Sequence, residues 1–206
     1  MTTYADAIAT DLLELSPQAQ DLLFREARTA STFTDEPVTD EQVAAIYDLV
    51  KWAPTSMNIQ PLRVLLIRSD EARARLLAHL APGNRAKTGA APLVAVLSTD
   101  HSFHEHLHRT FPHFPGAKAV FADAEVRADA ARLNGALQVA YFLLGVRAAG
   151  LAAGPMTGMD AAGIDAEFFA GTDQHVLAVV NIGRPGPDAW FPRSPRLDLE
   201  DVVTSV

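Results

Sequence analysis

The segment from Lys118 to Gly150 constrains the fold more than any other part of the sequence, because it contains no proline and many alanines. This composition predicts one long helix, with room for a break. Near residues 136–146 apolar side chains surround almost its whole circumference, which is typical of a helix buried on several sides. Four small residues would let another helix approach closely: Gly135, Ala136, Ala140 and Gly145. Two interpretations remain open, a central core helix within one chain and the interface of a homodimer.

The charge balance and the cysteine count exclude several classes of protein. The chain has 17 Lys and Arg against 25 Asp and Glu, a net charge of -8, so we expect no surface for nucleic acid or an anionic membrane. The absence of cysteine excludes disulfides, a thiol nucleophile and cysteine-ligated metal centres. The acidic N-terminal stretch is unlike a signal peptide. The longest apolar tract is interrupted by Asn134, Gln138 and Arg147, so we expect a cytoplasmic protein without a membrane-spanning helix.

Helices and strands alternate along the rest of the chain. Segments rich in alanine and leucine predict helices over residues 4–15, 18–27, 39–52 and 70–80. Apolar runs predict buried strands over residues 62–68, 93–97 and 176–182. In the third helix Thr39 suits the N-cap with Gln42 completing a capping box, and the expected buried face comprises Val43, Ile46, Tyr47 and Val50. This alternation predicts a sheet covered on both faces, in a single domain spanning residues 1–206.

Three segments could bind a ligand. Residues 53–61, APTSMNIQP, place hydroxyl and amide groups between prolines, which suits a heterocycle with alternating ring nitrogens and carbonyls. Residues 83–87, GNRAK, offer an amide and a lysine to an oxygen or an anionic charge. Residues 150–158, GLAAGPMTG, contain glycines that let a backbone approach a ligand closely. On composition alone, each segment is first interpreted as a turn or a solvated loop.

Arginines are scattered near the two ends of the chain. Arg28 follows an expected helix, whereas Arg193 and Arg196 lie in a proline-rich C-terminal arm. A guanidinium group can bind two phosphate oxygens at once, and each such charged hydrogen bond contributes about 1.5–3 kcal/mol. These residues are therefore candidates for a phosphate site, although a single arginine is usually solvated.

Five of the seven histidines fall within residues 101–113, HSFHEHLHRTFPH. His104, Glu105 and His108 formally match the H-E-x-x-H zinc pattern, in which Glu105 would be the general base. Pro112 leaves only about two helical turns to hold these ligands. A zinc hydrolase is therefore an alternative hypothesis, and adventitious metal binding or a pH-sensitive or substrate-facing loop explains the histidines better. We expect no resident metal.

Taken together and in order, the motifs resemble the FMN-dependent nitroreductase family from about Ala27 onward. They are Arg28-Thr29 before Phe33, APTSMNIQP, GN-x-x-K, GPMTG at 154–158, VVNIG at a strand end, and PR-x-PRLDLEDVV. The P-[ST]-S-x-N-x-Q-P loop is the most specific of them. Within the family, ARTASTFTDEPVTDE, RTFPH, GPMTGMD and DAEFFAGT are similar to the malonic semialdehyde reductase branch.

The resemblance implies an α+β fold of nitroreductase type, with a mixed central sheet flanked by helices, and an intertwined homodimer with FMN at its interface. By resemblance, Arg28 and Thr29 lie at the phosphate and ribityl end, and Arg193 and Arg196 complete the phosphate site. The residues expected at the isoalloxazine ring are Pro54, Thr55, Ser56 and Asn58, with Asn58 reaching from the other subunit.

The same resemblance assigns the remaining contacts of the ring. Asn84 and Lys87 would face its pyrimidine edge, where Lys87 could stabilise negative charge on reduced flavin. The other side would be lined by Pro155, Met156, Thr157 and Gly158, with the Thr157 N–H near flavin N5. Ala27 and Ser31 stand where the family usually has basic residues. FMN would then bind less tightly, or the C-terminal arginines would compensate.

The implied activity is NAD(P)H-dependent flavin oxidoreduction by ping-pong hydride transfer, in which no side chain must act as nucleophile or base. The branch resemblance implies reduction of 3-oxopropanoate (malonic semialdehyde) to 3-hydroxypropanoate in pyrimidine degradation. The alternatives are a general nitroaromatic or quinone reductase, and a flavin-binding protein without turnover. The choice between NADH and NADPH stays open.

Overall fold

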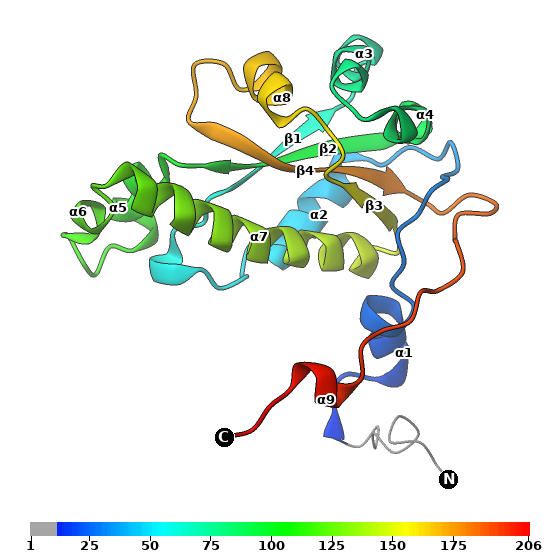
Figure 1. Cartoon of the computed structure of the whole chain (residues 1–206), viewed down its shortest axis with the longest axis horizontal. Helices are drawn as coiled ribbons and strands as arrows, with labels where there is room; N and C mark the ends of the chain where they lie inside the picture. Colours follow the sequence, from blue (N-terminus) through cyan, green and yellow to red (C-terminus); the bar gives the residue numbers. More distant parts are fainter. Residues whose placement is uncertain (1–11) are drawn as a thin grey trace.

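A four-stranded sheet lies at the centre of the computed structural model, which describes residues 12–206 (Figure 1). Its strands, in the order β1-β2-β4-β3, are β1 (Leu62–Ile67), β2 (Leu93–Asp100), β3 (Ala152–Met156) and β4 (Gln174–Gly183). Every pairing among these strands is antiparallel. The expected α+β class is confirmed, but the described sheet is antiparallel where a mixed sheet was expected. Apolar runs buried on both faces do not encode strand direction.

Short and long helices connect the strands and extend to both ends of the described chain. They are α1 (Pro17–Gln20), η3 (Asp21–Arg25), α2 (Asp40–Val50), η4 (Ser56–Asn58), α3 (Asp70–Ala78), α4 (Pro82–Ala90), η5 (Phe103–His106), α5 (Leu107–Thr110), α6 (Ala117–Val120), α7 (Ala124–Ala148), α8 (Ala161–Phe168) and α9 (Leu199–Val202). The helix expected over residues 4–15 falls largely outside the described residues. From residue 12 onward, no helix has the length and hydropathy needed to cross a bilayer.

Two apolar layers sandwich the sheet because successive strand residues point to opposite faces. In β2, Leu93, Ala95 and Leu97 pack in the cluster that includes residues of α2 and α7. The alternate residues Val94 and Val96 pack in the cluster that includes residues of α3 and α8. Figure 1 shows α3, α4 and α8 on one face of the sheet and α2 and α7 on the other. The expected burial of both faces is confirmed.

The helix expected over residues 39–52 is α2, and its predicted capping box is present. The Thr39 side chain accepts a hydrogen bond from the Gln42 N–H, and the Gln42 side chain accepts one from the Thr39 N–H. Ile46 is buried against the sheet, but Tyr47 is 61 % exposed, so its assignment to the buried face was wrong. Within α2 only Ile46 and Val50 are buried, so a narrow stripe of the helix is covered.

The long proline-free segment forms α6, a break at residues 121–123, and the 25-residue helix α7. Gly145 lets α2 approach α7 closely, because a Cβ at this position would lie 2.4 Å from Val50 Cγ1. Gly135 instead faces the sheet, where a Cβ would lie 2.1 Å from Thr99 Cγ2. On the outer side of α7, Leu133, Leu137 and Tyr141 are 66 %, 48 % and 41 % exposed. Within residues 12–206, the helix is therefore covered by its own chain on one side only.

Two segments interpreted as loops from composition are regular elements. Residues 83–87 lie inside α4, which begins with Pro82 at its first turn. The glycine-containing run after α7 forms β3, which pairs with β4. Beyond residue 190 the chain runs as an exposed arm that carries α9, as the sequence predicted (Figure 1).

Candidate functional site

A small cavity brings together the four predicted phosphate-end residues from both ends of the chain. Its volume is about 210 Å³, and its lining includes Arg28, Thr29, Arg193 and Arg196. The two chain ends are tied by main-chain acceptors: Arg28 Nη1 donates to the Phe191 carbonyl at 3.3 Å, and Arg193 Nη1 donates to the Ala27 carbonyl at 3.3 Å. Among residues 12–206 no carboxylate lines this cavity, and the nearest ion pair of its arginines joins Arg193 Nη2 to Glu26 Oε2 at 3.9 Å. Three guanidinium groups around it suit an anionic ligand.

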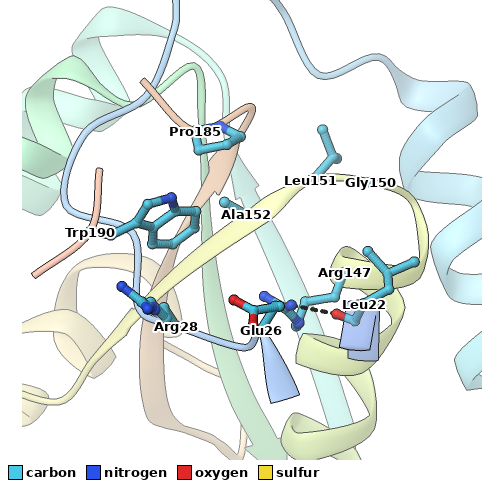
Figure 2. Close-up of a pocket in the computed structure, with 9 residues that line it drawn as sticks. All are labelled: Leu22, Glu26, Arg28, Arg147, Gly150, Leu151, Ala152, Pro185 and Trp190. Carbon is cyan, nitrogen blue, oxygen red and sulfur yellow. Dashed lines mark hydrogen bonds between the residues drawn. The ribbon is translucent and has the colours of Figure 1, made fainter. Parts of the chain in front are cut away.

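The Arg28 side chain also borders a larger cavity of about 380 Å³, shown in Figure 2. Its walls come from η3, the end of α7 and the C-terminal region, and include Glu26, Arg147 and Trp190. Burial lowers the pKa of the Arg147 guanidinium, an effect that Glu26 opposes. Glu26 lines this larger cavity and its Oε2 atom also lies 3.9 Å from Arg193 Nη2. The smaller cavity is the better place for a phosphate group because three arginines line it and only Arg28 and Arg147 line the larger one.

The guanidinium of Arg28 has spare hydrogen-bonding capacity. Its Nε atom is buried and has no partner in the part of the chain that the structure describes. A buried donor without a partner costs about 1–3 kcal/mol. Such a donor at the wall of a cavity fits a site that is completed by a ligand oxygen.

A second group of predicted residues lies where α4 meets the end of β3. Asn84 Nδ2 donates to the Gly158 carbonyl at 2.9 Å, and a Cβ on Gly158 would lie 2.8 Å from the same Nδ2 atom. The Thr88 hydroxyl contacts Met156 Sδ at 3.5 Å inside the core. Lys87 is half-buried and lies three residues after Asn84, so both side chains share a face of α4. The predicted grouping of 83–87 with 154–158 is therefore present.

The arginine cavity and the α4–β3 edge are neighbours on one protomer. The segment after Arg28 runs beside β3, with the Ala30 N–H donating to the Ala153 carbonyl at 3.0 Å. Gly154 allows this close approach, because a Cβ there would lie 2.7 Å from the Ala30 carbonyl oxygen. Pro155 and Met156 follow in the same strand, and Thr157 is exposed just beyond it.

The loop of residues 53–61 lies elsewhere. In Figure 1 it is the cyan segment on the side of α5 and α6, away from β3 and α4. Asn58 Nδ2 donates to the Thr110 carbonyl at 2.7 Å, which ties the loop to α5. A cavity of about 320 Å³ is lined by Pro54, Thr55 and Asn58 together with aromatic residues of and after α2. The structure therefore does not bring this loop to the other predicted site residues within one protomer.

The backbone of this loop is strained. Met57, Asn58 and Gln60 have positive φ angles of 47°, 51° and 43°. A left-handed conformation costs a non-glycine residue roughly 1–2 kcal/mol, and such strain gathers at functional sites. The Ser56 N–H donates to Asn134 Oδ1 at 2.8 Å, which fixes the loop on α7. The loop is therefore held in an unusual shape, in which Thr55 Oγ1 accepts from the Gln60 N–H and Asn58 Oδ1 accepts from Gln60 Nε2.

The H-E-x-x-H pattern does not form a metal site. Glu105 is 2.6 Å from Lys118 Nζ, and His108 Nδ1 is 2.9 Å from the main-chain oxygen of Glu105. The segment changes from η5 to α5 within the motif, so the even helical spacing that a zinc site needs is lost. In the part of the chain that the structure describes, the group able to hold a metal ion does not include His104 or His108.

Three polar residues of α7 matter to the site more than composition suggested. Asn134 holds the 53–61 loop, Gln138 Oε1 accepts from the Leu62 N–H at 3.0 Å, and Arg147 lines the larger cavity. All three interrupt the longest apolar tract of the sequence. Polar residues inside an apolar helical tract thus indicate buried side chains that form hydrogen bonds, as well as the absence of a membrane span.

Comparison with known protein sequences identifies relatives of the whole chain. Residues 24–184 match the description "Nitroreductase family". A Streptomyces coelicolor protein named "Putative NADH dehydrogenase/NAD(P)H nitroreductase" is 68 % identical over 196 residues, covering 94 % of this chain and 99 % of the relative. A Leptothrix cholodnii protein with the same name is 49 % identical, covering 90 % of this chain and 95 % of that relative.

Solved structures share the architecture at much lower sequence identity. A structure from Exiguobacterium sibiricum, described as a putative nitroreductase in complex with FMN, aligns with a TM-score of 0.81 at 20 % identity. The alignment covers 94 % of this chain and 99 % of that one. This likeness supports the same fold.

Proposed function

The chain belongs to the nitroreductase family, and from this premise we propose that it is an FMN-dependent NAD(P)H oxidoreductase acting as a homodimer. The observation that carries the proposal is the arginine cavity, where Arg28, Arg193 and Arg196 converge from distant parts of the chain. Relatives named as NAD(P)H nitroreductases support the electron donor. The FMN complex of a structural neighbour supports the cofactor.

The residues of this chain fit FMN in charge and in shape. The phosphate group would be held by Arg28, Arg193 and Arg196, with Thr29 beside it. Asn84 and Lys87 would face the pyrimidine edge of the ring, and residues 155–158 would lie along its other side. Gly158 leaves room at this edge, because any Cβ would crowd the Asn84 amide.

The protein contributes binding and electrostatics to the reaction. FMN, when bound, supplies the hydride chemistry between NAD(P)H and the acceptor. The ammonium group of Lys87 would offset negative charge at the pyrimidine edge, and the Thr157 N–H would donate toward the reacting end of the ring. One open face would serve NAD(P)H and acceptor in turn, which is a ping-pong order.

The second copy completes the site. We infer that Pro54, Thr55, Ser56 and Asn58 act on the ring bound by the partner, since they lie away from the other site residues of their own protomer. The exposed side chains Leu133, Leu137 and Tyr141 on α7 give an apolar surface for the dimer. The exposed C-terminal arm carries further apolar residues, including Leu197 and Val202 at 73 % and 64 % exposure, which suit wrapping around a partner.

Two classes of acceptor are each favoured by one observation. The segments similar to the malonic semialdehyde reductase branch favour 3-oxopropanoate, which would be reduced to 3-hydroxypropanoate in pyrimidine degradation. The names of the relatives favour a nitroaromatic compound, and quinones would react at the same open face. Steady-state comparison of kcat/KM for 3-oxopropanoate, a nitroaromatic and a quinone decides between them.

Purified protein tests the activity directly. We expect a yellow protein that releases FMN and is bleached by NADH or NADPH. A yellow protein that neither nicotinamide bleaches would mean a flavin-binding protein without turnover. Arg28→Ala should weaken FMN binding at least about tenfold, the equivalent of one charged hydrogen bond. Arg75→Ala on α3 removes the same charge at a site remote from the arginine cavity and should leave FMN binding unchanged.

A mixed dimer tests the shared site. One chain of the mixed dimer carries Arg28→Ala and Arg196→Ala. The other chain carries Ser56→Ala and Asn58→Ala. If the loop acts on the partner's flavin, the mixed dimer holds one site without lesions and one with both, so it retains about half of the wild-type flavin. If each protomer builds its own site, both sites are damaged and no strong binding returns.

A further inference from the structure

We propose that His101, Asp173 and His175 form a binding site for a divalent transition-metal cation such as Zn²⁺. A ring nitrogen of each histidine and a carboxylate oxygen of Asp173 all lie within 4.8 Å of one another. His101 directly follows β2, His175 lies in β4, and Asp173 immediately precedes β4. Imidazole nitrogen and carboxylate oxygen are common ligands of zinc.

The sheet register brings these residues together. Thr99 of β2 pairs with His175 of β4 in the ladder, and the His101 N–H donates to the Asp173 carbonyl at 2.8 Å. The two imidazole rings have centroids 4.3 Å apart and are tilted by 44°. The ligands are thus positioned by strand pairing, which is a more rigid support than a free loop.

The separation of the ligand atoms is close to what a metal needs. Bonds of about 2.0 Å in a tetrahedral site place ligand atoms about 3.3 Å apart. His175 Nε2 lies 3.7 Å from Asp173 Oδ1. Small rotations of these side chains about their own bonds would therefore complete the site.

Hydrogen bonds outside the cluster orient two of the three ligands, and His101 Nε2 lies 3.4 Å from the Thr99 hydroxyl. Asp165 of α8 lies 3.1 Å from His175 Nδ1, which leaves Nε2 free to ligate. The same carboxylate accepts the Val176 N–H at 2.8 Å, so it is itself held in place. A carboxylate behind a ligating histidine is a recurring feature of zinc sites.

Asp173 is oriented in the same way. The Ser102 hydroxyl donates to Asp173 Oδ2 at 2.9 Å, while Oδ1 faces His175. Its side chain is 44 % exposed and that of His175 is 50 % exposed, so water could occupy the remaining coordination positions. Asp165 and Asp173 together carry the two negative charges that a divalent cation would neutralise.

The cluster makes one histidine of residues 101–113 a proposed metal ligand, whereas the H-E-x-x-H pattern provides none. His101 is the first histidine of that segment, yet its partners are His175 and Asp173, more than seventy residues later. The site joins the start of this segment, at His101, to β4 and α8. An ion here would tie three elements together at the end of β4 that does not pair with β3.

Zinc binding to the full-length, untagged protein tests the proposal. Equilibrium dialysis and titration calorimetry at pH about 7.5, where unperturbed histidines are neutral, should give one Zn²⁺ per chain for the wild type. His101→Gln and His175→Gln should each lower the affinity at least tenfold. Asp165→Asn should lower it about tenfold through the loss of ligand orientation. Zn²⁺ should also raise the unfolding temperature of the wild type.

His106→Gln is the matched control, because it changes an exposed histidine of the same segment outside the cluster. It should bind Zn²⁺ like the wild type. Two results would overturn the proposal: a wild type that takes up no Zn²⁺ at micromolar concentration, or undiminished binding in both His101→Gln and His175→Gln. Measuring the unfolding temperature of each variant without metal separates lost ligation from lost folding.

Discussion

The two sides of α7 each carry side chains that are unusual for their surroundings, although Phe142 and Val146 pack in the core as expected. The side toward the sheet carries Asn134 and Gln138, which are only 4 % and 9 % exposed. The side toward solvent carries Leu133, Leu137 and Tyr141, which are 41 % to 66 % exposed. A helix that packs on a sheet with one side usually keeps leucines inward and amides outward.

This difference indicates that the inward and outward sides of α7 have different functions. The inward amides accept main-chain N–H groups of residues 56 and 62, so they fix the polar loop and the first residue of β1. The outward leucines are exposed and form the apolar surface on which the proposed second copy would pack. The experiments below disturb each side separately.

The largest effect is expected from Gly135→Val on the inward side. The new Cβ would lie 2.1 Å from Thr99 Cγ2 and 3.1 Å from Leu177 Cδ1, so α7 could not remain against the sheet. Overpacking of this kind costs about 3 kcal/mol or more. Urea unfolding should show the loss. Ala136→Val, the next residue on the exposed side, should stay within about 1 kcal/mol of the wild type. Equal losses in both variants would contradict the distinction between the two sides.

Leu137→Asp on the outward side should separate the dimer without unfolding the chain. A charge placed in an apolar interface weakens association at least about a hundredfold, equivalent to about 2.8 kcal/mol. Sedimentation velocity across a concentration series measures this change, and circular dichroism checks the fold. Ala74→Asp, at an exposed position of α3 on the other face of the sheet, is the matched control. A variant that sediments like the wild type would remove this side of α7 from the interface.

Asn134→Ala should have an intermediate effect. The Ser56 N–H loses its acceptor, which costs about 0.5–1.5 kcal/mol for a hydrogen bond that is only partly buried. Because the strained loop is then released, FMN affinity should fall together with stability. Arg132→Ala changes a side chain that is 69 % exposed two residues away, and should alter neither. Unchanged flavin affinity in Asn134→Ala would show that the loop keeps its shape without this contact.

The smallest effect concerns the pH response of His104 in η5, whose charged neighbours include Arg127 on the first turn of α7. Burial lowers the pKa of His104 from its usual value near 6.5, and the charge of Arg127 adds to this. The folded state therefore favours neutral His104. Its contribution to stability is complete above pH 6.5 and is lost as the pH falls below that value. Unfolding temperatures between about pH 8 and pH 5 should depend less on pH in His104→Gln than in the wild type.

The exposed His106 supplies the control for this prediction. His106→Gln should keep the pH dependence of the wild type. If His104→Gln and the wild type lose stability in parallel on acidification, another group is responsible.

Local signals in the sequence predicted several elements correctly for physical reasons. Thr39 and Gln42 form their capping box because both partners lie within one turn of each other. The convergence of Arg28 with Arg193 and Arg196 was also expected, but only from the resemblance. Nothing in the local sequence around Arg28 indicates a contact with a segment more than 160 residues away.

Tertiary packing decided the elements that composition missed. Residues 154 and 155 are glycine and proline, which favour turns, yet pairing with β4 makes them part of a strand. Gly154 is needed there because residue 30 passes directly against it. In α4, Gly83 and Gly89 weaken the helical signal, whereas the burial of Thr88 beside Met156 holds the helix in place.

The site could be predicted in part for the same reason. Motif order along the chain indicated which segments belong to one site, but it carries no information on which protomer supplies each segment. The cluster of His101 and His175 depends on the register of β2 and β4, which residue types alone do not determine. Alternating apolar residues specify that a strand is buried, and they leave its neighbours open.

The contact between Arg28 and Phe191, separated by 163 positions, also has a consequence for the order of events during folding. The sheet and its covering helices can form from residues in between, because their contacts do not require either end. The arginine cavity closes only when the last segment returns to the first, so it should be among the final parts to form. Closing a loop over such a span costs conformational entropy before the contacts at its ends can stabilise the chain. Binding of the flavin phosphate would then require that both ends of the chain have folded. Only correctly folded molecules would retain the cofactor.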